Sequence, residues 1–293
     1  MRNEILLIAI VLVAGCTILP NDSILSTLNI NLITQATEEM SVDVEIPSFV
    51  REGKTFQWTL TFAAENDITN LLIDVYDKGP YFSEDVPKVW EANEVFANRS
   101  KLFKTTYNVA EIDFPTEKTK IKFLIQYDSK FSATKTISML DDFEYESRYS
   151  KGTLSDMVTE GISSDVPLNI KISFDKPEPF QEDDEILMYL DYSFTGDGLI
   201  SGLDAGNVTI TFPETILELV ECDDYDYMTT ETTNIVTLEY PLTFFEGKAR
   251  RSTCKFKTIS DQPIATGSFQ VTADYTYQLL EEISMEIREW FYA

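Results

Sequence analysis

The stretch TFQWTLTF, residues 55–62, decides the fold class of this chain. Its apolar residues fall on every second position from Phe56 to Phe62, and polar residues occupy the remaining positions. Successive side chains of a β-strand point to opposite faces, so a period of two is typical of a strand with one buried face and one solvated face. We therefore predict an antiparallel β-structure built from strands of this kind.

The same alternation continues on both sides of this stretch. The first half of the chain contains further candidate strands at residues 42–46, 71–76, 104–110, 121–127 and 134–139. Short strands separated by turns at regular intervals favour an antiparallel sandwich. The first predicted domain covers residues 41–140.

One segment of this domain has a different pattern. Between residues 83 and 97, the apolar residues Val86, Val89 or Trp90, and Phe96 recur at helical spacing. Asp85 is placed to cap such a helix, and a proline is tolerated in its first turn. The pattern predicts a short helix across one end of the sheet.

A second series of alternating runs follows the polar, acidic segment 141–152, which we interpret as a linker between domains. The runs are 168–174, 186–194, 208–212, 216–222, 235–240, 254–258, 269–277 and 283–290. They predict a second, larger sandwich over residues 153–293.

Residues 41–140 resemble the immunoglobulin-like, adhesion-type domains of prokaryotic surface proteins. The resemblance is carried by TFQWTLTF at 55–62 and LLIDVY at 71–76, and residues 153–293 share only the general pattern. It implies an all-β fold of two tandem antiparallel immunoglobulin-like β-sandwiches, and a role in display or binding rather than catalysis.

The N-terminus predicts export. Arg2 precedes an apolar run, Ile5–Val13, that falls short of the roughly 18 to 20 apolar residues needed to span a bilayer. The sequence from Val13 through Ala14 and Gly15 to Cys16 resembles the lipobox of prokaryotic lipoproteins, in which the cysteine is lipidated and becomes the new N-terminus.

The resemblance implies a signal peptide over residues 1–15, a lipid on Cys16 and a tether over residues 16–40. The protein would then be lipid-anchored at the extracytoplasmic face of the cell membrane. Glu4 offsets the usual positive charge of such a signal. The alternative is an uncleaved membrane anchor that continues through Ile18 and Leu19.

Composition limits the function further. The chain has 293 residues and a formal net charge of −27, which argues against nucleic acid and against electrostatic binding to anionic lipid. It contains no histidine, which excludes Ser-His-Asp and Cys-His catalysis and zinc sites that rely on imidazole. Besides membrane lipid, the expected partner is a protein at the cell envelope or a second copy of this chain.

The two remaining cysteines, Cys222 and Cys254, predict a disulfide, which export would permit. Such a bridge would contribute on the order of 3 to 4 kcal/mol. The alternative is a pair of buried free thiols in a reducing compartment.

The one basic concentration recognised in this acidic chain is a candidate partner contact. It consists of Lys248, Arg250 and Arg251, followed by Lys255 and Lys257. The alternative is an edge strand that its charges protect against pairing with other chains.

Other motifs carry weaker predictions. Asn98 and Asn207 lie in glycosylation sequons. The acidic clusters at 183–185 and 223–226, and the Asp/Gly-rich loop 196–207, match no calcium-ligand template, so we expect solvated loops and no metal or other cofactor.

The sequence therefore predicts a non-catalytic, membrane-tethered binding or display protein. The alternative is a carboxylate-dependent carbohydrate-active enzyme or a carbohydrate-binding protein. No pair of carboxylates stands out as catalytic among 50 acidic residues.

Overall fold

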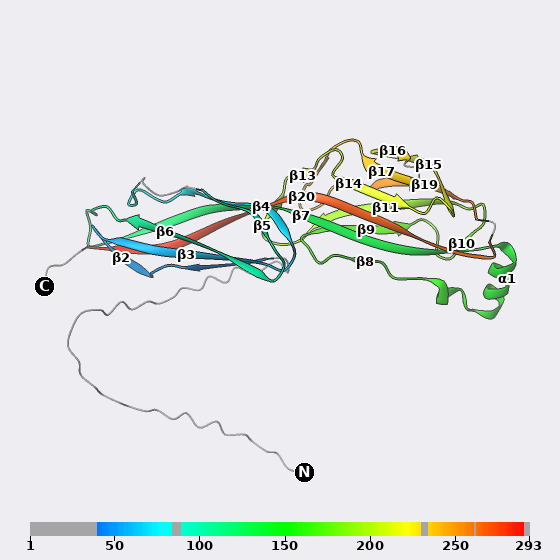
Figure 1. Cartoon of the computed structure of the whole chain (residues 1–293), viewed down its shortest axis with the longest axis horizontal. Coiled ribbons are helices and arrows are strands. Elements are labelled where there is room, and N and C mark those ends of the chain that lie inside the picture. Colours follow the sequence, from blue (N-terminus) through cyan, green and yellow to red (C-terminus); the bar gives the residue numbers. More distant parts are fainter. Residues whose placement is uncertain (1–39, 84–88, 230–233, 261, 290–293) are drawn as a thin grey trace, which may run out of the picture.

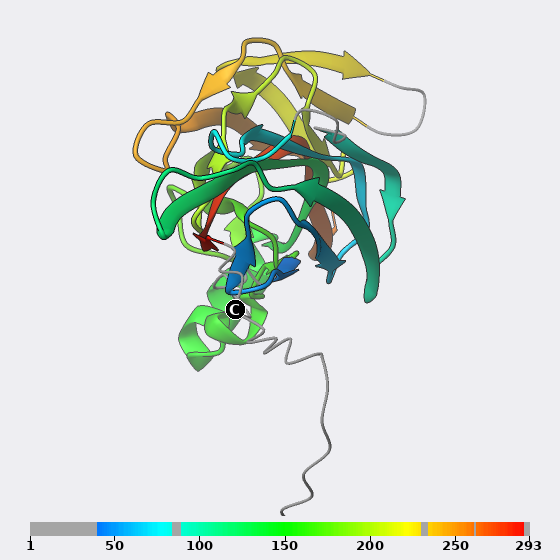
Figure 2. The same ribbon diagram turned by 90° about the vertical axis from the view of Figure 1, so that its left-hand side faces the viewer.

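The structure is a computed structural model that describes residues 40–83, 89–229, 234–260 and 262–289. The molecule is elongated, and two lobes follow each other along its long axis (Figure 1). Figure 2 looks along that axis, so that one lobe lies behind the other. The described chain is all-β except for the helix α1 (Asp142–Lys151) and the 3-10 turn η1 (Leu154–Met157). Neither helical segment of this described part has the length and apolar character needed to cross a bilayer.

Two long strands run through both lobes (Figure 1). β7 (Thr116–Leu140) and β20 (Ile264–Arg288) have 25 residues each and pair antiparallel over their whole length. At about 3.3 Å per residue, each strand extends for about 80 Å. The two lobes therefore share one continuous two-stranded spine.

The first lobe is a sandwich of two layers. The sheet β1-β3-β6 forms one layer, and the strands β5, β4, β7, β20 and β2 form the other, with β2 parallel to β20. The strands that only this lobe contains are β1 (Met40–Glu45), β2 (Phe49–Arg51), β3 (Thr55–Ala64), β4 (Ile68–Asp77), β5 (Val89–Val95) and β6 (Arg99–Asn108).

Aromatic side chains fill the space between these layers. The indole ring of Trp58 on β3 is fully buried, with its centroid 5.4 Å from that of Trp90 and 6.1 Å from those of Tyr107 and Phe123. Trp90 and Phe123 belong to the opposite layer. The stretch 55–62 therefore supplies the centre of the core in this lobe.

The second lobe is also a sandwich. One layer is the four-stranded sheet β15-β19-β11-β9, and the other is formed by β16, β17, β14, β20 and β7, with β8 and β10 pairing along β7. The bounds of the larger strands are β9 (Leu168–Phe174), β11 (Glu185–Phe194), β14 (Val208–Phe212), β15 (Leu217–Cys222), β16 (Tyr225–Thr229), β17 (Asn234–Leu238) and β19 (Ser252–Thr258). The short ones are β8 (Ile162–Ser163), β10 (Phe180–Gln181), β12 (Leu199–Ile200), β13 (Gly202–Leu203) and β18 (Leu242–Thr243).

The waist between the lobes is held by buried rings and polar contacts. Tyr127 on β7 and Tyr277 on β20 are paired in register, and their ring centroids lie 5.4 Å apart. The backbone N–H of Gly198 donates to the Tyr277 hydroxyl at 2.8 Å, and the Asn66 amide donates to the carbonyl of Asp165 at 3.1 Å. The first two contacts lie on or against the shared spine, and the Asn66 contact joins a loop of the first lobe to a loop of the second.

The all-β prediction with antiparallel sheets is confirmed, but the layout along the chain differs from the expected one. Residues 141–152, expected to link two successive domains, contain α1 and lie at the far end of the second lobe (Figure 1). The chain passes between the lobes inside β7 and β20 instead. The lobes are consequently not the successive units 41–140 and 153–293.

The helix expected over residues 83–97 is wrong where the structure describes it. Residues 89–95 form the strand β5, which pairs antiparallel with β4. Ala92 and Val95 are buried there, and Trp90 packs on Trp58. Tertiary pairing with β4 and burial of Trp90 in the core outweigh a helical spacing that rests on a few residues. The expected cap, Asp85, lies outside the described residues.

Candidate functional site

The predicted basic segment continues into β19 of the four-stranded sheet. Burial alternates along this strand: Cys254 and Phe256 face the core, whereas Lys255 and Lys257 face outward. We call the outward surface of this sheet the charged face, defined by its ionisable side chains and those at its margin. They are Lys171, Asp183, Glu185, Asp191, Glu218, Glu221, Arg251, Lys255 and Lys257.

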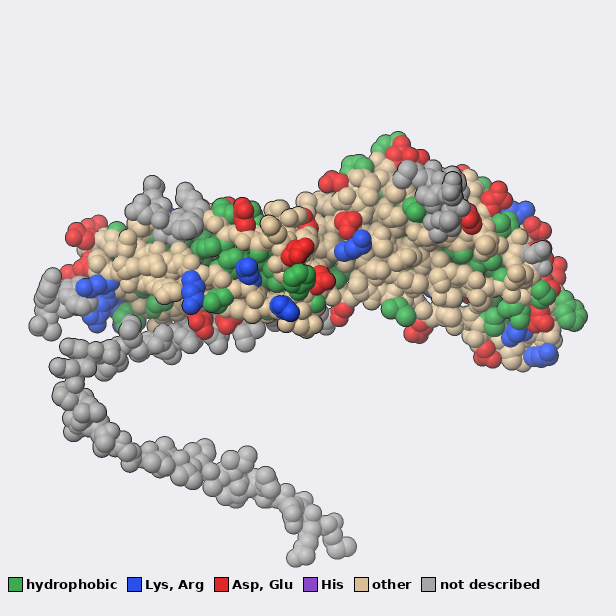
Figure 3. Space-filling view, in the orientation of Figure 1, with side chains coloured by type: hydrophobic (Ala, Val, Ile, Leu, Met, Phe, Trp, Pro, Cys, Tyr) green, Lys and Arg blue, Asp and Glu red, His purple; other side chains and the backbone are tan. Residues whose placement is uncertain are grey.

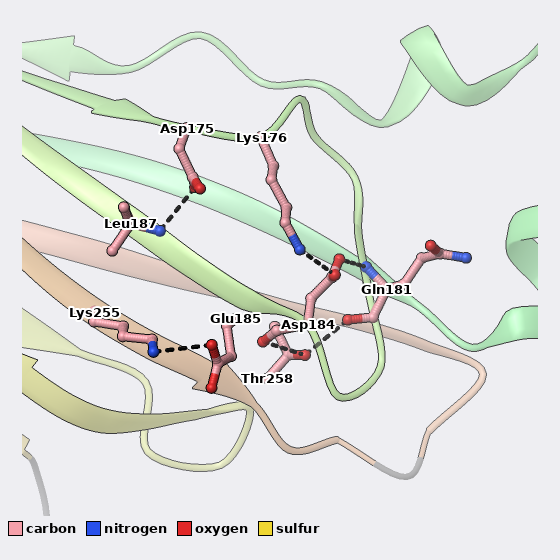
Figure 4. A network of polar contacts seen from close by, with 8 residues as sticks. All are labelled: Asp175, Lys176, Gln181, Asp184, Glu185, Leu187, Lys255 and Thr258. Carbon is pink, nitrogen blue, oxygen red and sulfur yellow. Dashed lines mark hydrogen bonds and ion pairs between the residues drawn. The ribbon is translucent and has the colours of Figure 1, made fainter.

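Cations and anions alternate from strand to strand on the charged face. Lys257 is in register with Glu218 on one side and Glu185 on the other. Lys255 Nζ lies 2.9 Å from Glu185 Oε2 (Figure 4), and Lys257 Nζ lies 3.0 Å from Asp183 Oδ1. The hydrogen bond from Lys255 lowers the pKa of the Glu185 carboxyl, and the carboxylates raise the pKa of both lysines. The charges of the face are therefore largely satisfied within the chain.

Arg251 makes a two-pronged contact with β11. Its Nε and Nη2 atoms lie 2.7 and 2.9 Å from the two carboxylate oxygens of Asp191, and its guanidinium lies 4.8 Å from the ring centroid of Tyr189. Hydrogen bonding to Asp191 raises the pKa of Arg251. The planar fork of arginine suits this geometry.

Arg250 lies at the surface end of a series of hydrogen-bonded polar side chains that leads into the core. It pairs with the carboxylate of Asp224, which accepts a hydrogen bond from Ser252 Oγ at 3.4 Å. Ser252 Oγ in turn accepts from the Tyr192 hydroxyl at 3.3 Å, and that hydroxyl also bonds the hydroxyl of Tyr225. Both tyrosines and Ser252 are buried. Sequence reasoning missed this series, because no local pattern shows that these residues meet.

The buried tyrosines of this hydrogen-bonded series are not suited to general acid–base catalysis near neutral pH. Desolvation raises the pKa of Tyr192 to about 12 and raises that of Tyr225 well above its ordinary value. Both phenols stay protonated near pH 7 and serve as hydrogen-bond donors and acceptors. Arg250 compensates the charge of Asp224, whose side chain is only 13% exposed.

The acidic loop before β11 also uses its carboxylates internally (Figure 4). Asp184 accepts hydrogen bonds from Lys176 Nζ at 2.5 Å and from the Gln181 backbone N–H at 2.9 Å. Asp175 accepts one from the Leu187 backbone N–H at 2.7 Å. In the described ranges, no three Cys, Asp or Glu side chains form a group that could hold a metal ion.

The predicted disulfide is present. Cys222 on β15 and Cys254 on β19 are bonded and face each other in register, with Cα atoms 4.0 Å apart. The bridge ties the outer strand of the four-stranded sheet to its neighbour. Asp223 and Asp224 follow directly and turn the chain into β16 of the other layer, so the disulfide fixes this corner.

Lys248 stands apart from the two arginines. It lies in the hairpin turn 245–248, where Glu246 and Gly247 have positive φ angles of 50° and 76°. Phe245 in the same turn is 78% exposed, and Lys248 is exposed as well. Of the three predicted contact residues, Lys248 thus lies in an exposed turn beside the exposed ring of Phe245. Arg250 and Arg251 are both engaged in ion pairs.

The remaining predicted sites are the two glycosylation asparagines and the lipidation cysteine. Asn98 is exposed in the turn between β5 and β6 with a φ of 57°. Asn207 is half-buried before β14, and its carbonyl accepts from the Asp274 backbone N–H at 2.9 Å. Cys16 lies outside the described residues.

A second concentration of lysines was missed by the sequence analysis. Lys118, Lys120 and Lys122 project from the same side of β7 and line a groove in the first lobe. Their period-two spacing is visible in the sequence and could have revealed them. Across the face shown in Figure 3, Lys and Arg side chains lie among Asp and Glu rather than in one continuous basic field.

No protein-family model and no curated protein matches this chain. Among solved structures, the secreted serine protease VesC from Vibrio cholerae is 10% identical with a TM-score of 0.20, over 79% of this chain and 49% of that one. The C-terminal globular domain of an oligosaccharyltransferase from Pyrococcus abyssi is 12% identical with a TM-score of 0.20, over 84% and 46%. The α2-macroglobulin of Escherichia coli is 12% identical with a TM-score of 0.23, over 87% and 22%. This chain thus spans less than half the length of each, and such low TM-scores carry no argument about function.

Proposed function

We propose that this protein is a non-catalytic binding or display protein, held at the extracytoplasmic face of the cell membrane by a lipid on Cys16. In this proposal, the two sandwiches are immunoglobulin-like modules of a surface lipoprotein that contacts a partner in the envelope. The observation that carries the proposal is the combination of a continuous spine of about 80 Å with aromatic side chains exposed on the second lobe.

The most exposed aromatic rings of the second lobe lie at two places. Phe143 and Tyr149 on α1 are 77% and 67% exposed, and Phe245 is 78% exposed in its hairpin turn. Exposed aromatic side chains are the usual anchors of protein interfaces, because they bury a large area at low conformational cost. A stiff spine would hold such anchors at a fixed distance from the first lobe.

The internal charge pairing also supports a binding role. Most carboxylates of the charged face are engaged by lysines or arginines, and the buried tyrosines keep their protons. A glycoside hydrolase needs two carboxyl groups about 5 to 10 Å apart across a cleft. The groove in the first lobe is lined by three lysines and by two carboxylates, and each of these carboxylates is engaged in an ion pair, Asp77 with Lys122 and Glu286 with Arg288.

The anchor is tested by fractionation. In the proposal, Cys16→Ala leaves the membrane fraction or stays unprocessed. Normal processing and full membrane retention of that variant would refute the lipid anchor and favour a plain transmembrane segment.

The partner contact is tested by affinity capture from an envelope extract with the full-length chain in detergent. Lys248→Glu combined with Phe245→Ser should lose a specifically captured protein. Arg250→Glu is a poor probe, because it would leave Asp224 without its compensating charge. Lys101→Glu, at an exposed lysine on β6, is the matched control and should capture as the wild type does. If the double variant captures the same protein equally well, the hairpin turn is not the contact.

A further inference from the structure

The three lysines on β7 line a groove of about 620 Å³, which we call the lysine groove. Lys118, Lys120 and Lys122 alternate with inward-facing residues, so the strand period places all three on one side. The loop after β4, with Gly79 and Pro80, forms another part of the wall. The volume falls within the range of small-molecule sites, about 300 to 1,000 Å³.

Two of the lysines have acidic partners. Lys120 pairs with Glu282 on β20, and Lys122 Nζ lies 3.3 Å from Asp77 Oδ2. Asp77 also accepts the backbone N–H of Gly79 at 3.0 Å, and these two contacts lower the pKa of its carboxyl. Both carboxylates are therefore already paired with lysines of β7.

Lys118 differs from its two neighbours. Glu286 lies opposite it in the β7–β20 register, but Arg288 Nε binds Glu286 Oε1 at 2.6 Å. Lys118 has no acidic partner among the described residues. The groove lining thus contains three lysines and two carboxylates, Asp77 and Glu286, in a chain whose net charge is −27.

The wall beside the lysines is fixed by close packing. Gly79 has a φ of 68°, and a Cβ added there would lie 2.2 Å from Thr119 Oγ1. Only glycine allows the loop to approach β7 this closely. A wall that is already in place spares a ligand the cost of ordering it.

The chemistry of the lining suggests the ligand. Ser48 and Ser284 contribute hydroxyl groups, Pro80 contributes apolar surface, and the lining contains no aromatic ring. Hydroxyl groups suit the hydroxyls of a sugar, and one excess cation suits a single anionic group. We propose that the lysine groove binds an acidic saccharide, a sugar unit that carries a carboxylate or sulfate, with Lys118 pairing to the anion.

This proposal rests on a binding role for the protein, but not on the hairpin turn or the anchor. Its test is calorimetric titration of the full-length chain in detergent with digalacturonate, and with galactobiose as the uncharged counterpart. We expect saturable binding of digalacturonate with a dissociation constant of about 1 mM or tighter. Added salt should weaken it, because the ion pair is exposed.

The variants make the test specific. Lys118→Glu should weaken digalacturonate binding by about tenfold or more, since it replaces an attraction by a repulsion. Lys101→Glu should bind as the wild type does, and an unchanged thermal transition would show that both variants fold. The proposal is overturned if Lys118→Glu binds equally well, if galactobiose or inorganic sulfate binds as tightly as digalacturonate, or if no acidic disaccharide binds. None of these outcomes bears on capture through the hairpin turn, so the two proposals fail separately.

Discussion

The ion pair between Lys135 and Glu178 makes a sharp prediction about stability. Lys135 interrupts the inward-facing row of β7, and its Nζ lies 2.8 Å from Glu178 Oε1 in the loop before β10. The two side chains are only 13% and 7% exposed, and Lys135 also donates to the carbonyl of Thr159. The second oxygen of Glu178 is buried and has no hydrogen-bond partner.

Removing one member of this pair should cost far more than removing both. Glu178→Ala leaves the ammonium of Lys135 buried without its counter-charge, which typically costs about 3 to 5 kcal/mol. Lys135→Met combined with Glu178→Leu fills the same space with apolar groups and should lie within about 1 kcal/mol of the wild type. Together with the single variants Lys135→Met and Glu178→Leu, this double variant closes a double-mutant cycle, and the coupling energy from that cycle should be large.

The measurement is urea unfolding of the full-length chain and its variants under one set of conditions. The matched control is the surface pair Lys130–Asp274 between β7 and β20, at 3.7 Å with side chains 63% and 67% exposed. Asp274→Ala should cost about 1 kcal/mol or less. If Glu178→Ala costs no more than Asp274→Ala, the buried pair does not carry an uncompensated charge and the reasoning fails.

Three further outcomes follow from the core, the disulfide and the charged face. Trp58→Ala should lose about 3 to 5 kcal/mol by opening a cavity between the layers, and an equilibrium unfolding curve within 1 kcal/mol of the wild type would contradict this. Cys222→Ser with Cys254→Ser should lose about 2 to 4 kcal/mol in the same assay, and stability unaffected by reducing agent would argue against the bridge. The pKa of Glu185 is lowered in the folded state by Lys255, so its contribution is present above its ordinary pKa of 4.5 and is lost as the pH falls through the folded value. Glu185→Gln should therefore reduce stability at neutral pH more than at about pH 3, as unfolding curves at the two pH values would show.

Alternation in the sequence predicted most strands correctly, because each strand has one buried face. Residues 168–174 coincide with β9, and residues 55–62 lie within β3. The sequence analysis split each long strand in two, however. Ser129 interrupts the inward-facing row of β7 but is buried, and Glu281 interrupts that of β20 while half-buried. Desolvation raises the pKa of Glu281, with Asp197 adding to the effect.

The helix errors have a different cause. α1 has an Asp141 side chain that caps the Glu144 N–H at 2.6 Å and a left-handed Gly152 at its end, which are ordinary boundary signals. It was missed because none of its residues is buried, so it shows no apolar stripe. β5 was misread because its partner, β4, lies elsewhere in the chain and cannot be seen in a local window.

The candidate sites were visible in the sequence only as lists of charges. Nothing in the spacing of Arg250 and Arg251 shows that Asp224 and Asp191 lie beside them, since this depends on the register between β19 and its neighbours. In the structure, the arginines of the predicted basic segment are ion-paired, and the hairpin turn 245–248 is the part of it that stays exposed.

The shared spine gives these surface features a common frame. A pair of sandwiches joined by a linker could reorient freely, whereas here β7 and β20 pass through the waist while remaining paired at every residue. Bending at the waist would have to break backbone hydrogen bonds and separate the buried rings of Tyr127 and Tyr277. The lysine groove on the first lobe and the hairpin turn on the second are therefore connected by one continuous pair of strands and not by a flexible linker.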